Sequence, residues 1–168
     1  MDGSWFHARG ARNEPPPLEA GIPLLIGGSG ERRTLPIVAR DADAWNGEGD
    51  PETFARKNAL LDELCRAQAR ESSSVRRTVG LPPVIIRNDR SEAVTTLAER
   101  LSRHGLSRTS AEAVAVTSPL VGPPALVAAR LREYHDAGAE EVVIDWPSPS
   151  DLPTLEALAT EVREELTS

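Results

Sequence analysis

The sequence predicts an α/β fold with parallel strands, and three observations support this class. Short apolar runs alternate with longer segments of helical periodicity along the 168 residues. Helix-sized connections between successive strands require parallel pairing with right-handed crossovers. The length accommodates four βα units at roughly 30 residues or more each, but not a complete eight-stranded β/α barrel, which needs about 250 residues.

Residues 1–22 are expected to form an extended N-terminal arm, and residues 23–168 the folded unit. The run Asn13-Glu14-Pro15-Pro16-Pro17 cannot be helix or central strand, because consecutive prolines fix φ and lack amide donors. A frayed terminus is the alternative interpretation of this arm.

The first βα unit is predicted from an apolar run followed by glycines. Residues 22–26 are continuously apolar, as a strand buried on both faces requires. Glycines at 27, 28 and 30 interrupt the run, and the spacing then predicts a helix over 31–42. Glu31 is expected in its first turn, where its charge suits the helix dipole.

The second unit begins with a very short strand over 43–46. Asp50 is the expected N-cap of the next helix, with Pro51 at its first position. The helix is predicted over 51–70, because apolar residues recur there at helical spacing. These are Phe54, Leu60, Leu61, Leu64 and Cys65.

The third unit is less regular. Residues 75–87 are rich in β-formers, and Ser91 is expected to cap a helix that Gly105 ends near His104. Residues 106–118 give a weak pattern, in which 114–116 read as a short strand or an extended loop.

The fourth unit is clearer. A helix is predicted from Pro123 or Pro124 to Ala137, with Gly138 as its stop signal. A strand over 141–146 and a helix over 153–166 complete the alternation.

Composition argues against two classes of partner. Nineteen basic residues against 26 acidic ones give a net charge of −7, which repels phosphate backbones, and 4% aromatic content offers few base-stacking surfaces. No apolar run approaches the roughly 20 residues of a membrane span. We therefore expect neither nucleic acid nor membrane as a partner.

The few cysteines and histidines limit the possible metal sites and indicate the cellular location. Cys65 is the single cysteine, so neither a disulfide framework nor a thiolate metal cluster is possible within the chain. No histidine has a second one at ligand spacing, and no metal site is expected. With no signal-peptide run at the N-terminus, a cytoplasmic location is expected.

The turn Gly27-Gly28-Ser29-Gly30 is the most informative feature for chemistry. Glycines let the backbone approach a ligand, and amides at a following helix N-terminus favour an anion. A phosphate cradle and a plain tight turn are both open interpretations. The turn matches neither a Walker A loop nor the six-position dinucleotide fingerprint.

A second candidate lies at the end of the next strand. Asn46 or Gly47 could line a pocket beside a planar ligand, since α/β folds place ligands at strand carboxyl ends. Alternatively, Trp45 packs in the core and Asn46 forms a turn hydrogen bond. Cys65 and His135 are interpreted as structural, and no catalytic residue is assigned.

The chain resembles the bacterial luciferase-like family, and more closely its branch that uses the deazaflavin coenzyme F420. The stretch from Ile22 to Leu35 resembles the family pattern P-x-L-I-G-G-x-G-x-x-x-T-L. Further matching stretches follow in the same order, at residues 38–46, 61–67, 121–124, 131–138 and 142–144. Ala69-Arg70-Glu71 departs from the usual Gly-Arg-Asp, which would shift a turn after the long helix.

The resemblance implies a partial (β/α)8 barrel, the four C-terminal βα units of a flavin- or deazaflavin-dependent oxidoreductase or monooxygenase. It implies that the loop holding the cofactor's phosphate and chain includes Ile26, Gly27, Gly28, Ser29 and Gly30, with Asn46 or Gly47 near the cofactor. F420 is the expected cofactor, FMN the alternative, and the substrate a small molecule.

The family's first four strands, which largely support the cofactor ring in relatives, are absent from this sequence. Four parallel strands alone would expose two edges and an apolar face. A homodimer or a complementing N-terminal half-barrel chain could cover them, and a truncated gene product of poor stability is the third interpretation. The alternative function is a non-catalytic half-barrel, a remnant or assembly subunit without turnover of its own.

Overall fold

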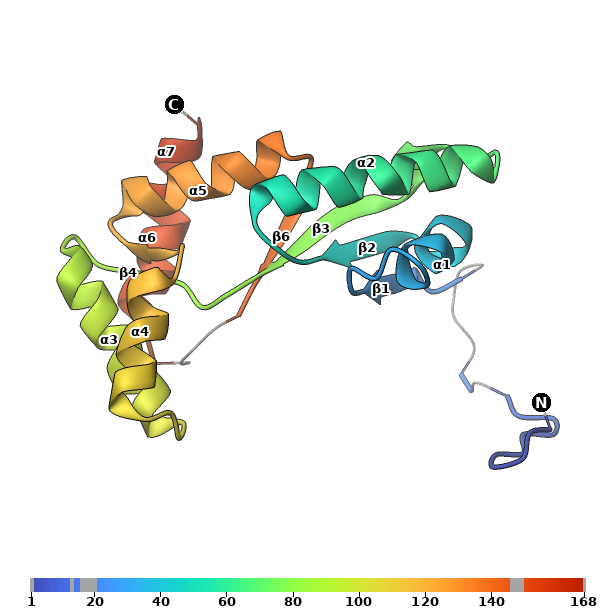
Figure 1. Cartoon of the computed structure of the whole chain (residues 1–168), viewed down its shortest axis with the longest axis horizontal. Helices are drawn as coiled ribbons and strands as arrows, with labels where there is room; N and C mark the ends of the chain where they lie inside the picture. The colour runs from blue at the N-terminus through green and yellow to red at the C-terminus, as the bar shows by residue number, and fades with distance from the viewer. Residues whose placement is uncertain (1, 13, 16–20, 146–149, 168) are drawn as a thin grey trace.

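The fold centres on a four-stranded parallel sheet in the computed structural model, which describes residues 2–12, 14–15, 21–145 and 150–167. The strands stand in the order β1-β2-β3-β6, each parallel to its neighbour. They are β1 (Leu25–Gly27), β2 (Ala44–Gly47), β3 (Arg76–Leu81) and β6 (Glu141–Ile144). The prediction of an α/β fold with parallel strands alternating with helices is therefore confirmed (Figure 1).

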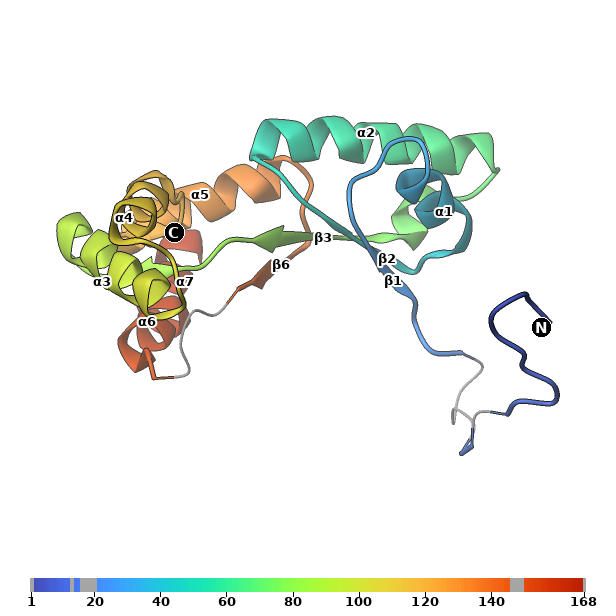
Figure 2. The ribbon, with the colours of Figure 1, turned by 60° about the horizontal axis from the view of Figure 1, so that its bottom comes forward.

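Three helices pack against one face of this sheet: α1 (Thr34–Asp41), α2 (Pro51–Ala67) and α5 (Pro124–Asp136) (Figure 2). As predicted, Asp50 caps α2, because its carboxylate accepts a 2.8 Å hydrogen bond from the Thr53 amide. This bond holds the pKa of Asp50 below its ordinary value. Gly138, with φ of 93°, follows the end of α5 as predicted.

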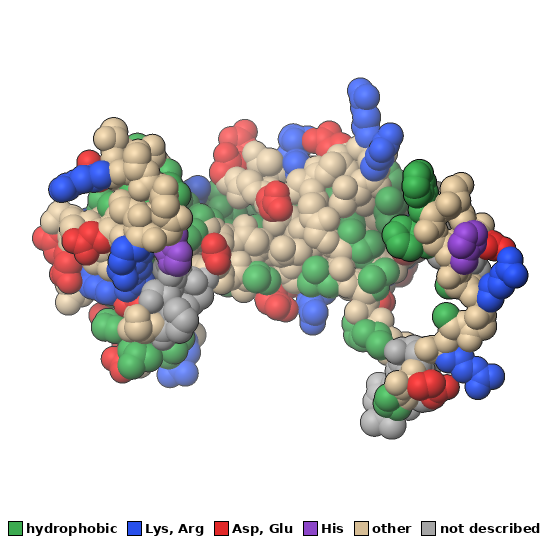
Figure 3. Space-filling view, turned by 90° about the horizontal axis from the view of Figure 1, so that it is seen from below, with side chains coloured by type: hydrophobic (Ala, Val, Ile, Leu, Met, Phe, Trp, Pro, Cys, Tyr) green, Lys and Arg blue, Asp and Glu red, His purple; other side chains and the backbone are tan. Residues whose placement is uncertain are grey.

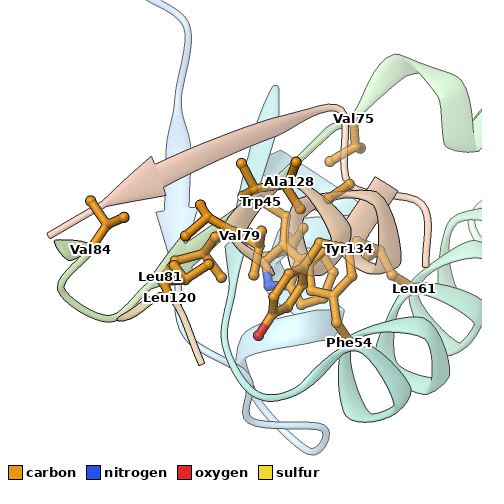
Figure 4. Close-up of a cluster of buried hydrophobic side chains, with 14 of the residues drawn as sticks. Trp45, Phe54, Leu61, Val75, Val79, Leu81, Val84, Leu120, Ala128 and Tyr134 are labelled. Carbon is orange, nitrogen blue, oxygen red and sulfur yellow. The ribbon is translucent and has the colours of Figure 1, made fainter. Parts of the chain in front are cut away.

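The main core lies between the sheet and these helices. Trp45 of β2 stacks on Phe54 of α2, with ring centroids 5.1 Å apart and planes 6° from parallel. Both rings are fully buried, and Tyr134 of α5 joins them with its hydroxyl donating to the Gly49 carbonyl at 3.0 Å. Figure 4 shows these rings together with Val79 of β3. The interpretation of Trp45 as a core residue is confirmed.

A second, smaller sheet and a helical hairpin interrupt the third βα unit. The predicted segment 75–87 divides into β3 and β4 (Ile85–Ile86), and β4 pairs in parallel with β5 (Val121–Gly122). Between β4 and β5 lie α3 (Arg90–Arg103) and α4 (Arg108–Thr117), which share a separate core. That core contains Ile85, Ala93, Leu97, Ala98, Ala111, Ala115 and Val121.

The expectation of a strand or extended loop over 114–116 is wrong, because this segment belongs to α4. Ser107 caps α4 by accepting a 3.2 Å hydrogen bond from the Ser110 amide. Ala111 and Ala115, four residues apart, are buried on its inner side, whereas Val114 and Val116 are exposed. Tertiary packing of the alanines therefore outweighs the β-propensity of the valines.

Three further local expectations are also wrong. Asp89, not Ser91, caps α3, with its carboxylate accepting from the Ser91 amide at 2.6 Å. Helix α1 starts at Thr34 rather than at Glu31, whose carboxylate instead pairs with Arg56 at 2.8 Å. Leu25 is 48% exposed rather than buried on both faces, because β1 is an outer strand of the sheet.

The C-terminal segment packs as a nearly continuous helix, as predicted for 153–166. It comprises α6 (Leu152–Ala157), a π-helical stretch η2 (Leu158–Val162) and α7 (Arg163–Thr167). The final residues of the strand predicted over 141–146 lie partly outside the described residues, and β6 ends at Ile144. Within the described part of the chain, no helix has the length and apolarity that crossing a bilayer requires.

A buried ion-pair cluster joins α6 to the smaller sheet and α3. Asp151, 2% exposed, accepts hydrogen bonds from Arg87 and Arg100 at 2.9 Å each and from the Thr154 hydroxyl at 2.7 Å. Burial by itself would raise the pKa of Asp151, but the hydrogen bonds from Thr154, Arg100 and Arg87 outweigh it and lower the pKa.

We expect Asp151→Asn to lower the free energy of unfolding by about 3 kcal/mol at pH 7, because two largely buried guanidinium groups lose their counter-charge. The folded-state pKa of Asp151 is depressed, so the stability that its carboxylate contributes is fully present above the unfolded-state pKa of about 3.9. It disappears as pH falls through the folded value, and the difference between wild type and variant should then shrink. Urea denaturation at several pH values measures this, with the exposed Asp136→Asn as control.

The turn after α2 contains a strained residue at the position where the sequence departs from the family pattern. Ala69 has φ of 53°, in the left-handed region that favours glycine. Arg70 is nevertheless well placed, since its guanidinium donates to the carbonyls of Ala39 and Ala42 at the end of α1, at 3.1 and 2.6 Å. The turn thus accommodates alanine at a conformational cost.

We expect Ala69→Gly to stabilise the protein by about 1 kcal/mol, because glycine adopts this φ without steric strain. Ala59→Gly is the matched control, since Ala59 is exposed in the middle of α2, where glycine costs about 1 kcal/mol. Thermal unfolding should therefore shift in opposite directions for the two variants. Equal destabilisation by both would contradict the assignment of strain to Ala69.

Candidate functional site

The candidate site lies at the carboxyl ends of β1 and β2, the edge where parallel α/β sheets bind ligands. Ile26 and Gly27 end β1, Gly28-Ser29-Gly30 follow as the loop toward α1, and Asn46 and Gly47 end β2. The sheet register pairs Gly27 with Asn46. The structure thus brings all seven candidate residues to one end of two neighbouring strands.

Three hydrogen bonds tie the glycine loop (residues 27–30) to β2 and the residue after it. The Gly28 amide donates to the Asn46 carbonyl at 3.0 Å, and the Trp45 indole donates to the Gly28 carbonyl at 2.8 Å. The Glu48 amide donates to the Ser29 hydroxyl at 3.1 Å. The loop is therefore fixed in position by the end of the neighbouring strand.

Helix α2 holds the loop from the other side. The half-buried Lys57 ammonium donates to the Ser29 carbonyl at 2.9 Å, and Arg56 pairs with Glu31 just beyond the loop. Sequence reasoning missed Lys57. Its one signal was that Lys57 is the single lysine of the chain, and spacing did not connect it with a turn 28 residues earlier.

The loop glycines are required for different reasons. Gly28 has φ of 106°, so its backbone favours glycine, whereas a Cβ on Gly30 would lie 2.9 Å from the Thr34 hydroxyl, so glycine there leaves room for that side chain. A Cβ on Gly27 would meet nothing within 4 Å. The missing side chain at Gly27 therefore leaves open space at the strand end instead of avoiding a clash.

Asn46 and Gly47 face opposite sides of the sheet. The Asn46 side-chain oxygen accepts a 2.8 Å hydrogen bond from the Thr78 hydroxyl, on the face away from the helices. Gly47 faces the core, where a Cβ would lie 2.6 Å from Trp45 and 2.8 Å from Phe54. Aromatic packing accounts for glycine at position 47, whereas the Asn46 amide lies beside the open end of the strands.

The protein surface next to the glycine loop is electropositive. Helix α1 begins with no side-chain cap at Arg33, and Arg32 and Arg33 are exposed there. Neither guanidinium forms an ion pair with a residue in the described ranges. Residues 29–34 line an open hollow of about 560 Å³. Loop amides, a helix N-terminus and two cations together suit an anionic group such as phosphate.

Away from this loop, the described residues offer neither an exposed thiol nor a metal-ligand cluster. Cys65 is fully buried, and burial raises the pKa of its thiol, as expected of a structural cysteine. Among residues 2–12, 14–15, 21–145 and 150–167, no three His, Cys, Asp or Glu side chains group as metal ligands would.

Comparison with protein families shows the family to which this chain belongs. Residues 1–141 match the luciferase-like monooxygenase family, and the chain belongs to that family. The family resemblance read from the sequence is confirmed. No match was found among curated proteins.

Solved structures agree in fold. The chain is similar to a coenzyme F420-dependent tetrahydromethanopterin reductase from Methanopyrus kandleri (TM-score 0.66, 17% identity, 86% of this chain and 51% of that one). An F420-dependent secondary alcohol dehydrogenase in complex with an F420–acetone adduct gives a TM-score of 0.74 at 14% identity, over 99% of this chain and 55% of that one.

A riboflavin lyase solved with modified FMN and riboflavin gives a TM-score of 0.69 at 15% identity, over 99% of this chain and 47% of that one. The chain thus spans about half the length of the solved structures it matches. It has the fold of a half-barrel, with four parallel strands of the eight in a β/α barrel.

We expect Lys57→Met to loosen the glycine loop, because the charged hydrogen bond to the Ser29 carbonyl contributes on the order of 1 kcal/mol. Amide hydrogen exchange at residues 28–31 should speed up by about fivefold. Lys57→Arg, which retains a cation, should preserve most of the protection. Unchanged exchange in Lys57→Met would show that the hydrogen bonds from β2 suffice.

Proposed function

We propose that this chain is the C-terminal half of a flavin- or deazaflavin-dependent oxidoreductase that acts on a small molecule. The observation that carries the proposal is the glycine loop, held open at the strand ends by β2 and Lys57. Family membership and the F420 and FMN named for the similar structures support the same class. F420 is the proposed cofactor, with FMN as the alternative.

The residues present fit the phosphate-bearing chain of such a cofactor. Backbone amides of Ser29 and Gly30 would face the phosphate, and Arg32 and Arg33 would supply positive charge beside it. When bound, the cofactor supplies hydride chemistry, and the protein contributes position and electrostatics.

Asn46 is proposed to contact the cofactor at the same strand end. The hydrogen bond from the Thr78 hydroxyl occupies its side-chain oxygen, and the side-chain NH2 group then lies beside Gly80 near the carboxyl end of β3. Gly80 keeps space beside that NH2 group, since a Cβ there would lie 3.3 Å from it. The role of Gly47 is then to admit the aromatic pair below the site.

The proposed location and the units needed for turnover follow from the composition and from the number of strands. A cytoplasmic location rests on the single cysteine, a buried free thiol. Turnover is proposed to require four more βα units, from a second copy or from an N-terminal half-barrel chain. A half-barrel that assembles without turnover is the second candidate, favoured by the absence of an acid–base pair among the described residues near the loop.

Titration of the folded chain with F420 and with FMN tests the cofactor assignment, alone and with a complementing half-barrel. Gly27→Ala should weaken binding at least tenfold without loss of stability, because its methyl group enters open space at the strand end. Gly21→Ala is the matched control, since its Cβ also meets nothing but lies before β1. Failure of both cofactors to bind under either condition would refute the assignment.

A further inference from the structure

We propose that the groove between α3 and α4 is a docking surface for a second copy of this chain, which packs across it about a two-fold axis in a weak, reversible dimer. Each copy sets its groove against the groove of the other, with facing helices antiparallel. The inference is independent of the proposed function, because the groove belongs to the helical hairpin and not to the glycine loop.

The helical hairpin is a separate unit at one end of the molecule. It has a core of its own and lies at the end opposite the N-terminal segment (Figure 1). His104 caps the end of α3, and Gly105, with φ of 101°, turns the chain toward α4. A surface on this hairpin is therefore distant in sequence from the candidate cofactor loop.

An open groove of about 750 Å³ runs between the two helices. Its lining residues recur at every fourth position, which keeps the groove parallel to both helices. They include Val94, Ala98 and Ser102 on α3, and Arg108, Glu112 and Val116 on α4. Val116 is 56% exposed, so the described residues leave apolar surface uncovered here.

Charges of opposite sign lie in order along α3. Glu99 and Arg103 line the groove one helical turn apart, and both are exposed. In the part of the chain that the structure describes, neither side chain forms an ion pair. Their spacing also permits a pair within the helix, but such a pair contributes little at an exposed site.

Helix α4 carries the same two charges in mirrored order. Arg108 begins the helix just after the turn, and Glu112 follows one helical turn later, with their side chains 3.0 Å apart. Because the hairpin reverses the chain, both arginines lie near the turn and both glutamates lie further from it. The midpoints of the two pairs are residues 101 and 110, four positions before Gly105 and four positions after Leu106.

A two-fold axis through these midpoints, perpendicular to the helices, matches the charges of both helices at once. It sets α3 against α3 of the second copy, and α4 against α4. Glu99 then faces Arg103 of the second copy, and Arg108 faces Glu112 of the second copy. Each of these contacts occurs twice by symmetry, so every charge in the groove meets its opposite.

The same rotation matches the apolar positions. It carries Leu106, which is 39% exposed at the turn, to the level of Val94 and Val116 in the second copy. Figure 3 shows acidic and basic side chains next to hydrophobic ones at the end of the molecule that carries the hairpin. This self-complementary order of charges is the observation that selects a second copy over an unrelated helix.

The size of the hairpin face predicts a weak dimer. The 14 residues of α3 span about 21 Å, and two helices side by side are about 20 Å wide. Pairing would bury roughly 800 Å² in total, below the roughly 1,200 Å² at which stable interfaces begin. We therefore expect reversible association in the micromolar range.

Sedimentation equilibrium of the full chain over a range of concentrations, without cofactor, tests this association. A dimer of twice the 18.1 kDa chain mass should form. Raising the salt concentration from about 0.05 M to about 0.5 M should weaken the dimer about fivefold, because exposed ion pairs are screened.

Charge reversal tests the proposed symmetry. Glu99→Arg or Arg103→Glu alone should raise the dissociation constant roughly tenfold, because the two symmetry-related pairs become repulsive. The double variant should return it to near the wild-type value, since both pairs re-form with their signs exchanged. Glu63→Arg and Arg66→Glu, at exposed positions of α2, are the matched controls and should leave association unchanged.

Val116→Glu should weaken association, whereas Val114→Glu should not, because Val114 is exposed on the same helix but does not line the groove. Far-ultraviolet circular dichroism checks the folding of each variant, and the charge-reversal set decides alone if Val116→Glu unfolds. Three results would overturn the inference: a chain that stays monomeric up to about 1 mM, a dimer that the groove variants leave unchanged, or a double variant that associates no better than the single ones.

Discussion

The stacking of Trp45 on Phe54 is the contact on which both the core and the candidate site depend. It joins β2 to α2 in the centre of the molecule, and it excludes any side chain at Gly47. The same indole donates its N–H to the Gly28 carbonyl, so the ring that fills the core also fixes the glycine loop. Core packing and the position of the glycine loop are thereby coupled through one residue, since a shift of the indole moves the loop with it.

A one-sided sheet is the second constraint. A β/α barrel buries one sheet face under helices and the other in its own interior, and this chain satisfies only the first requirement. The glycine loop and Asn46 are both formed by residues of this half alone. The proposed cofactor loop is thus formed entirely by the four units present, whereas closure of the barrel is not.

The sequence allowed prediction wherever a local rule and tertiary packing agreed. Asp50 before Pro51 marks a helix start that α2 obeys, and Gly138 marks the end of α5. Prediction failed for α4, where buried alanines overrode exposed valines, and for Lys57, whose contact with Ser29 arises only after folding. Gly47 stays a predicted ligand position, and the structure adds a packing reason for glycine there, since a Cβ would lie 2.6 Å from the Trp45 ring and 2.8 Å from the Phe54 ring.

The helical hairpin of α3 and α4 has a core of its own, set apart from the residues around Trp45. It joins the chain through the short strands β4 and β5 and through Asp151. The hairpin can therefore be lengthened, shortened or replaced without repacking the main core around Trp45. Among relatives, we expect differences in size and sequence to accumulate in this hairpin.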